Sequence, residues 1–258
     1  MTIVINEGTS LVTLERNYPV SISEIDRQYM LKPAVLFNFM QDLAAKSIDH
    51  YGHQYCWDEL YKKGLGWFLI RYRVEFDDYP VNVSGLKIQT ESRGCNRMTA
   101  YRDFEVFDCN SNRRYLRASS SWFIVNLENK SVVSIQNEYP DFLRYEKRED
   151  DLTLRKLSSF ETFDFQKVFH VRYDDLDIND HVNNTVYITW AMEVLDYKFR
   201  SSHKLKTMDI YFKHEVKYGD DIISQVRYDM ENLSTEHVIK NVNTGEELCL
   251  LRFEYQSL

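Results

Sequence analysis

The chain has 258 residues, of which 43% are hydrophobic and 14% aromatic, so it can form one large globular domain or two small ones. Its net charge of −8 argues against a protein that binds nucleic acid, and its eight glycines form no phosphate-binding loop. The apolar stretches are too short to span a membrane, and the first residues, MTIVINEGTS, do not resemble a secretory signal. We therefore expect a cytoplasmic protein.

The first predicted helix runs from Pro33 to Tyr51, because Pro33 suits a first helical turn and Gly52 suits a C-terminal end. Runs of aromatic and β-branched residues then predict strands at 67–76, 86–92, 99–107 and 115–125. A charged stretch, residues 144–151, predicts a solvated connector that crosses to a second sheet. We thus expect an N-terminal unit at 1–138 and a connector at 139–160.

The next informative segment, residues 171–195, carries three polar residues at alternate positions. In an extended chain Asp177, Asn179 and His181 point to the same side. A carboxylate, an amide and an imidazole in one small volume can hold a water, share a proton and donate hydrogen bonds to an oxygen. The segment is therefore a candidate site for acid–base chemistry.

A nearly apolar helix is predicted after this trio, starting at the paired asparagines Asn183 and Asn184 and ending near Arg200. With Lys198 as an exception, its polar residues form one narrow stripe: Thr189, Glu193, Asp196 and Arg200. Such an apolar helix is usually buried against a sheet, and its first backbone amides would lie near the trio. A core helix with an asparagine cap is the alternative, but a cap does not require Asp177 and His181.

The chain contains an internal repeat, because residues 20–44 align without a gap on residues 171–195, an offset of 151. Asp26 aligns with Asp177. The other two positions differ, with Gln28 and Met30 in place of Asn179 and His181. Methionine cannot transfer a proton, so the first copy is predicted to be a scaffold and the second copy, in a unit at 161–258, to be catalytic.

The second half continues with predicted strands at 208–218, 222–230, 237–241 and 247–255. Aligning Ile70 with Ile210 places Glu75 on Glu215, which we expect in a strand that faces the polar trio. A surface carboxylate is the alternative for Glu215. Each half is predicted to be one long helix followed by an antiparallel sheet, which gives an α+β protein with helices packed on a curved sheet.

The four cysteines, Cys56, Cys95, Cys109 and Cys249, have no metal-binding or redox spacing, so we expect free thiols. The remaining histidines show no metal spacing with paired acids. The sequence therefore predicts neither a metal nor a cofactor.

With these motifs the chain resembles the acyl-acyl-carrier-protein thioesterases, found as plant plastid enzymes and as bacterial relatives. The family signature D-L-D-x-N-x-H-V-N-N stands here at residues 175–184 as DLDINDHVNN. Two more stretches are similar to the family, RASSSW at 117–122 and FKHEV at 212–216. The resemblance covers most of the chain. It implies a double hotdog fold, in which two long central helices are wrapped by antiparallel sheet.

The resemblance also implies hydrolysis of the thioester that links a fatty acyl chain to acyl carrier protein. The family's catalytic positions match Asp177, Asn179, His181 and Glu215. The family's cysteine after the glutamate is Val216 here, and valine cannot attack a thioester, so we expect direct attack by water.

We assign provisional roles to these residues as a hypothesis. Glu215 is the base or positions the water, and His181 protonates the leaving thiolate. Asn179 orients the water or binds the carbonyl oxygen, and Asp177 fixes the imidazole or the loop. Backbone amides at the start of the following helix would stabilise the oxyanion.

The implied partner is acyl carrier protein, which is acidic, so one basic cluster could dock it: Arg200, His203, Lys204 and Lys206. A solvated helix end is the alternative for this cluster. A hotdog enzyme acting on coenzyme A thioesters, a dehydratase of the same fold and a non-catalytic acyl-thioester binding protein stay open as other functions. The sequence decides neither the acyl chain length nor whether the chain forms a homodimer.

Overall fold

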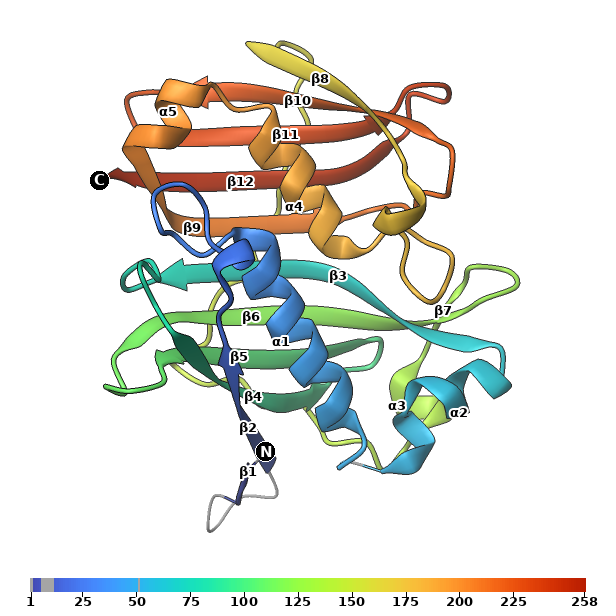
Figure 1. The fold of residues 1–258 in the computed structure, drawn as a ribbon. Helices are drawn as coiled ribbons and strands as arrows, with labels where there is room; N and C mark the ends of the chain where they lie inside the picture. Colours follow the sequence, from blue (N-terminus) through green and yellow to red (C-terminus); the bar gives the residue numbers. More distant parts are fainter. Residues whose placement is uncertain (1, 6–11, 51) are drawn as a thin grey trace.

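The structure, a computed structural model, describes residues 2–5, 12–50 and 52–258. Within these residues one antiparallel sheet runs through the whole molecule, and the helices α1 and α4 lie side by side on one of its faces (Figure 1). The strand order is β1-β2-β4-β5-β6-β3-β9-β12-β11-β10-β8, and the short β7 pairs with β6. Strands from the two halves of the chain therefore meet at β3 and β9, in the middle of the sheet.

The strands in the first half are β1 (Thr2–Ile5), β2 (Val12–Pro19), β3 (Leu65–Phe76), β4 (Gly85–Cys95), β5 (Thr99–Asp108), β6 (Arg114–Asn126) and β7 (Val132–Val133). Those in the second half are β8 (Phe165–His170), β9 (His203–Phe212), β10 (Asp221–Asp229), β11 (Ser234–Asn241) and β12 (Glu247–Ser257). The α-helices are α1 (Pro33–Ile48), α2 (Trp57–Lys62), α3 (Ile135–Glu138), α4 (Asn184–Glu193) and α5 (Tyr197–Ser202). Among the described residues, no helix is long and apolar enough to cross a bilayer.

Most predicted strands are confirmed within a few residues, as β3 to β6 and β10 to β12. The sequence missed β2 and β8, which pair with β4 and β10. The strand predicted at 208–218 is wrong, because β9 ends at Phe212 and the chain then leaves the sheet. The carbonyl of Val216 accepts a hydrogen bond from the backbone N–H of Val182 at 3.0 Å, instead of joining a strand ladder.

The first predicted helix is confirmed as α1, although it ends at Ile48, and Tyr51, its predicted end, lies outside the described residues. The prediction of a single helix from Asn184 to Arg200 is wrong, because a non-helical segment separates α4 from α5. Asp196 explains the break.

Asp196 is the N-cap of α5. Its side chain accepts hydrogen bonds from the backbone N–H groups of Lys198 at 2.9 Å and Phe199 at 3.1 Å. An aspartate in this role favours the non-helical backbone that precedes a new helix. The residue that fitted the polar stripe of one long helix therefore starts a separate one.

The two copies of the internal repeat fold into matching loops. In the second loop Asp177 Oδ1 accepts hydrogen bonds from the backbone N–H groups of Asn179 and His181, at 2.8 Å and 3.4 Å. In the first loop Asp26 Oδ1 accepts the two corresponding bonds, at 2.8 Å and 3.0 Å. The aspartate N–H also bonds to the carbonyl four residues later in both loops, at 2.7 Å and 2.8 Å. The repeat is therefore structural as well as sequential.

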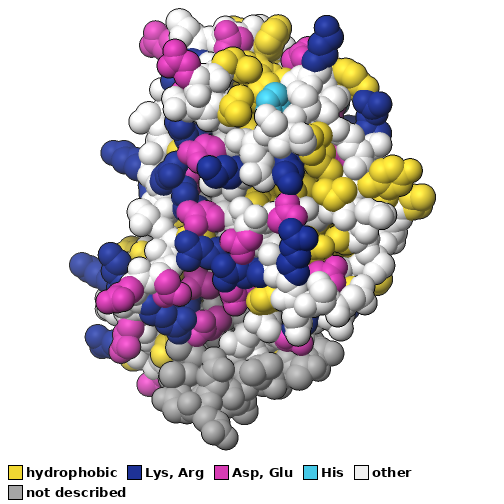
Figure 2. All heavy atoms as spheres, turned by 90° about the vertical axis from the view of Figure 1, so that its left-hand side faces the viewer, with side chains coloured by type: hydrophobic (Ala, Val, Ile, Leu, Met, Phe, Trp, Pro, Cys, Tyr) yellow, Lys and Arg dark blue, Asp and Glu magenta, His cyan; other side chains and the backbone are white. Residues whose placement is uncertain are grey.

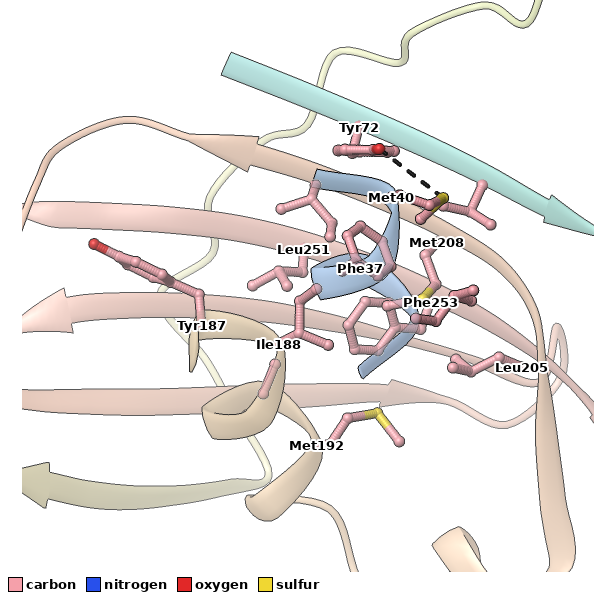
Figure 3. Close-up of a cluster of buried hydrophobic side chains, with 14 of the residues drawn as sticks. Phe37, Met40, Tyr72, Tyr187, Ile188, Met192, Leu205, Met208, Leu251 and Phe253 are labelled. Carbon is pink, nitrogen blue, oxygen red and sulfur yellow. Dashed lines mark hydrogen bonds between the residues drawn. The ribbon is translucent and has the colours of Figure 1, made fainter. Parts of the chain in front are cut away.

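Side chains from both halves form one hydrophobic core between the sheet and the helices (Figure 3). Phe37 and Met40 of α1 and Ile188 of α4 are fully buried in it. They share this cluster with Tyr72 of β3 and Phe253 of β12, which are fully buried too. The halves are therefore packed as one body and not only linked by the sheet.

The other face of the sheet carries a buried ion pair where the two halves meet. Arg73 of β3 contacts both carboxylate oxygens of Asp209 in β9, at 2.9 Å and 2.8 Å. The two side chains are 7% and 2% exposed. Arg155 of the connector lies 3.8 Å from Asp209 and pairs with Glu254 at 3.0 Å, so the connector contributes to this site.

The charged connector is only partly solvated, in contrast to the prediction. Residues 146–150 are exposed, as expected. Asp151 instead binds the buried guanidinium of Arg93 at 2.6 Å and accepts a hydrogen bond from the Tyr145 hydroxyl at 2.7 Å. These contacts fix the connector against the sheet.

The ion pair at the junction predicts a specific stability pattern. Arg73→Met leaves the buried Asp209 carboxylate without its main partner, so we expect a loss of about 3 kcal/mol in the free energy of unfolding. Arg117→Met, which removes a more exposed pair with Glu75, should cost less than about 1 kcal/mol. Urea denaturation measures both. If the double variant Arg73→Met/Asp209→Leu is not more stable than Arg73→Met alone, the loss does not come from an unpaired buried charge.

Candidate active site

A pocket of about 760 Å³ lies at the junction of the two halves. Its polar lining from the second half includes Asp177, Asn179, His181 and Glu215, so all four predicted site residues reach the same pocket. Its apolar lining comes mainly from the first half and includes Ala44, Ile48, Trp57, Trp67, Phe68 and Phe142. The pocket therefore joins a polar end to an apolar end.

The central contact of the polar end is between an imidazole and a carboxylate. His181 Nε2 lies 3.1 Å from Glu215 Oε2, and the two side chains are 20% and 23% exposed. The same oxygen accepts a hydrogen bond from Lys130 Nζ at 3.0 Å. The other oxygen, Glu215 Oε1, is buried and has no hydrogen-bond partner among the described residues. One carboxylate oxygen is thus held by two groups, and the other can accept a further hydrogen bond.

Glu215 lies in the loop after β9, so the expectation that it lies in a strand is wrong. A matching backbone hydrogen bond of 3.0 Å exists in each half, from Leu31 to Pro80 and from Val182 to Val216. By this match Tyr79, which precedes Pro80, occupies the place of Glu215, whereas the sequence alignment chose Glu75. The Tyr79 hydroxyl donates to the Leu31 carbonyl at 2.7 Å, so this position serves packing in the first half.

Asp177 is positioned to hold its own loop. Its carboxylate accepts backbone hydrogen bonds within the loop, while the His181 ring contacts Glu215. Asp26 makes the same backbone contacts in the first half, where the histidine is absent. Of the two roles left open for Asp177, the geometry therefore favours the loop over the imidazole.

Two backbone amides at the start of α4 are already occupied. The Asn183 side chain accepts from Thr185 N–H at 3.0 Å, and the Asn183 carbonyl accepts from Val186 N–H at 2.9 Å. These two N–H groups are therefore not free to stabilise an oxyanion, contrary to the expectation for the start of this helix. Asn179 Nδ2 makes only a long contact of 3.5 Å with Asp177, so its amide remains available as a donor.

No cysteine lines the pocket among the residues that the structure describes. Burial raises the pKa of Cys95 to about 11, and burial together with Asp49 raises the pKa of Cys56 to about 12. Burial also holds the pKa of the Cys249 thiol well above its usual range. Val216, at the family's cysteine position, is itself buried. Protonated thiols away from the pocket cannot serve as the nucleophile.

One group of described residues could bring metal-ligand atoms together, namely His53, Cys56 and Asp58, whose donor atoms lie within 4.8 Å of one another. The sequence did not predict this group, because its short spacing follows no common metal motif. The Cys56 thiol donates to Asp49 Oδ1 at 2.8 Å, and the His53 ring is 76% exposed. The geometry therefore favours a hydrogen-bonded thiol and not a metal ligand.

The basic cluster predicted to dock a carrier protein lies away from the loop that carries Asp177 and His181. It follows α4, a helix of 10 residues and hence about 15 Å long, whereas the loop precedes this helix. Arg200 pairs with Glu193 at 2.6 Å, and Lys204 pairs with Asp78 at 2.8 Å. The face that contains α5 and the start of β9 has Lys and Arg interleaved with Asp and Glu (Figure 2). These pairings favour a solvated surface over a docking site.

Models of two protein domains match this chain. Residues 12–143 match the acyl-ACP thioesterase N-terminal domain, and residues 159–257 match the acyl-ACP thioesterase C-terminal domain, where ACP is acyl carrier protein. Together the two matches cover most of the chain.

Individual relatives agree with these matches at low identity. A chloroplastic palmitoyl-acyl carrier protein thioesterase of Arabidopsis thaliana is 26% identical over 95% of this chain and 64% of its own length. A chloroplastic oleoyl-acyl carrier protein thioesterase of the same plant is 27% identical over 64% of this chain and 48% of its own length. The chain thus spans only about half to two thirds of these relatives.

Solved structures share the fold. An acyl-ACP thioesterase from Bacteroides thetaiotaomicron has a TM-score of 0.81 at 19% identity, with 95% of this chain and 98% of that chain covered. A 12:0-ACP thioesterase from Umbellularia californica has a TM-score of 0.79 at 23% identity, with the same coverage. The double hotdog fold expected from the sequence is therefore confirmed.

Because the two loops match, we predict that Asp26 and Asp177 contribute equally to the free energy of unfolding, whereas only Asp177 affects the pocket. Asp26→Ala and Asp177→Ala each remove an oxygen that holds two backbone N–H groups, so each should cost about 1 to 2 kcal/mol in the free energy of unfolding. Only Asp177→Ala should also shift the NMR signals of the His181 ring. Unchanged His181 signals in that variant would contradict the loop-holding role.

Proposed function

Because the chain belongs to the acyl-ACP thioesterase family, we propose that it is a thioester hydrolase that releases a free fatty acid from acyl-ACP. The contact between His181 and Glu215 at the polar end of a largely apolar pocket carries this proposal. It puts an acid–base pair beside a space that suits an acyl chain. The acyl chain would lie against the first half, and the thioester would lie beside the loop of the second half.

In this mechanism water attacks the carbonyl carbon of the thioester directly. Glu215 Oε1 takes a proton from the water, since it is the buried oxygen with no partner among the described residues. The water oxygen forms the new C–O bond, and the C–S bond breaks. Glu215 passes this proton to the neutral His181 ring across their 3.1 Å contact, and the resulting imidazolium gives it to the leaving thiolate. The products are the fatty acid and the free thiol of the carrier.

Asn179 and Asp177 support this step in different ways. The side-chain amide of Asn179 would donate a hydrogen bond to the carbonyl oxygen as negative charge develops on it, and one such donor contributes about 3 kcal/mol in other acyl-transfer enzymes. Asp177 keeps Asn179 and His181 in place through its backbone hydrogen bonds.

Water is the proposed nucleophile because the chain offers no thiol at the site. Val216 replaces the family's cysteine, and the described lining of the pocket contains no other cysteine. A thioester is an activated acyl group, so a positioned water can attack it without an acyl-enzyme.

A thiol-release assay with acyl-ACP and acyl-coenzyme A substrates in parallel tests this function. We expect a higher kcat/KM for acyl-ACP. A higher kcat/KM for acyl-coenzyme A would replace the proposal by a coenzyme A thioesterase. Binding of the acyl thioester without thiol release would instead indicate an acyl-binding protein.

The acid–base pair predicts strong effects of two substitutions. His181→Ala and Glu215→Gln should each lower kcat/KM by about 10²- to 10⁴-fold while the melting temperature changes by only a few degrees, because both side chains are partly exposed. Adding Met30→His to His181→Ala should not restore activity, since Tyr79 stands where a second glutamate would be needed. Restored hydrolysis in this double variant would show that the first half can also work.

The absence of a thiol at the site predicts that a cysteine-free protein stays active. The variant Cys56→Ser/Cys95→Ala/Cys109→Ser/Cys249→Ala should keep turnover within a few fold of the wild type, provided that circular dichroism shows it folded. Mass spectrometry during turnover supplies the opposing result: an acyl group attached to any of the four cysteines would overturn the water mechanism.

A further inference from the structure

Lys130 crosses from the first half of the chain to the catalytic residues of the second. Its Nζ atom lies 3.0 Å from Glu215 Oε2, and the two residues are 85 positions apart. It also lies 5.8 Å from the centre of the Phe68 ring, and that ring lies 6.5 Å from the ring of His181. Lys130 is therefore part of the polar end of the pocket, although no motif in the sequence marks it.

A well-ordered turn between β6 and β7 presents Lys130. The Asn126 side chain accepts from the backbone N–H groups of Glu128 and Asn129, at 3.0 Å and 3.1 Å. The Lys130 N–H bonds to the Asn126 carbonyl at 2.9 Å, and Lys130 adopts a positive φ of 58°. Glycine and asparagine prefer this left-handed conformation, which is unfavourable for a lysine. The turn itself therefore does not favour a lysine at position 130. The contact of its side chain with Glu215 is what explains the lysine.

We infer that Lys130 is a positioning residue for the hydrolysis proposed above: it binds Glu215 Oε2 and so leaves Oε1 to the reacting water. The ammonium group of Lys130 and the ring of His181 both contact Oε2, and together they restrain the carboxylate in the orientation that the reaction needs. This role rests on the proposed function, because it concerns the same reaction.

Other charged groups near Glu215 are less suited to this role. Lys213 pairs with Glu247 at 2.7 Å, and His214 lies 3.3 Å from Glu246. Lys217 and Asp177 line the pocket, but neither makes an ion pair with Glu215 among the described residues. Lys130 and His181 are therefore the two groups that contact the carboxylate directly.

Lys130→Asn is the decisive variant, because asparagine tolerates the left-handed backbone and removes the cation. We expect the melting temperature to stay the same or rise. The kcat should fall about threefold with KM nearly unchanged, a modest loss because the lysine is partly exposed. Lys130→Arg should restore the wild-type kcat.

Two controls distinguish this role from a general effect of net charge. Lys147→Met removes an exposed lysine of the connector and changes the net charge equally, so its kcat should match the wild type. The NMR signals of the His181 ring, assigned with His181→Ala, should shift in Lys130→Asn and stay unchanged in Lys147→Met.

The NMR comparison requires no activity, so it decides the inference even if the wild type hydrolyses no acyl thioester and the proposed function fails. Unchanged His181 signals in Lys130→Asn would overturn the role of Lys130. So would a loss of kcat that Lys130→Arg does not restore.

Discussion

The pairing of β3 with β9 is the constraint on which the rest of the structure depends. It joins two half-sheets into one, through the register from Arg71–Tyr211 to Glu75–Thr207. On one face the pair of α1 and α4 packs over this junction, and on the other Arg73 and Asp209 form a buried ion pair. The loop that carries Asp177 and His181 can contribute to a pocket lined by apolar residues of the first half only because this ladder fixes the relative position of the two halves. The hydrogen bond from Asn184 to Gln41 and the ion pair of Lys130 with Glu215 both span the same junction.

A comparison of the two repeat copies distinguishes the residues that hold the loop from the residues that line the pocket. Both halves use an aspartate to hold a short loop and both start a helix directly after it. The two halves differ at two corresponding pairs of positions, Met30 and His181, and Tyr79 and Glu215. Met30 is buried in the core, and Tyr79 donates to a backbone carbonyl, whereas His181 and Glu215 contact each other at the pocket. One framework therefore supports packing in the first half and a polar site in the second.

Local signals in the sequence predicted the framework, and long-range contacts decided the rest. Pro33 and the paired asparagines placed the starts of α1 and α4, because helix caps depend on neighbouring residues. The alternation of Asp177, Asn179 and His181 brought these residues to one pocket as predicted. The break before α5 was missed because Asp196 fitted both a polar stripe and a cap. The end of β9, the loop position of Glu215 and the approach of Lys130 depend on contacts between distant segments, and no local pattern carries them.

The order of synthesis gives the junction a further consequence. The first half leaves the ribosome with β3 paired to β6 on one side only, since its partner on the other side is β9. About 140 residues separate the paired positions Tyr72 and Ile210, so translation at 5–20 residues per second leaves that strand edge uncovered for roughly 7 to 30 seconds. An open strand edge can pair with another nascent chain. The junction that completes the pocket is therefore also a site at which the growing polypeptide is exposed to aggregation.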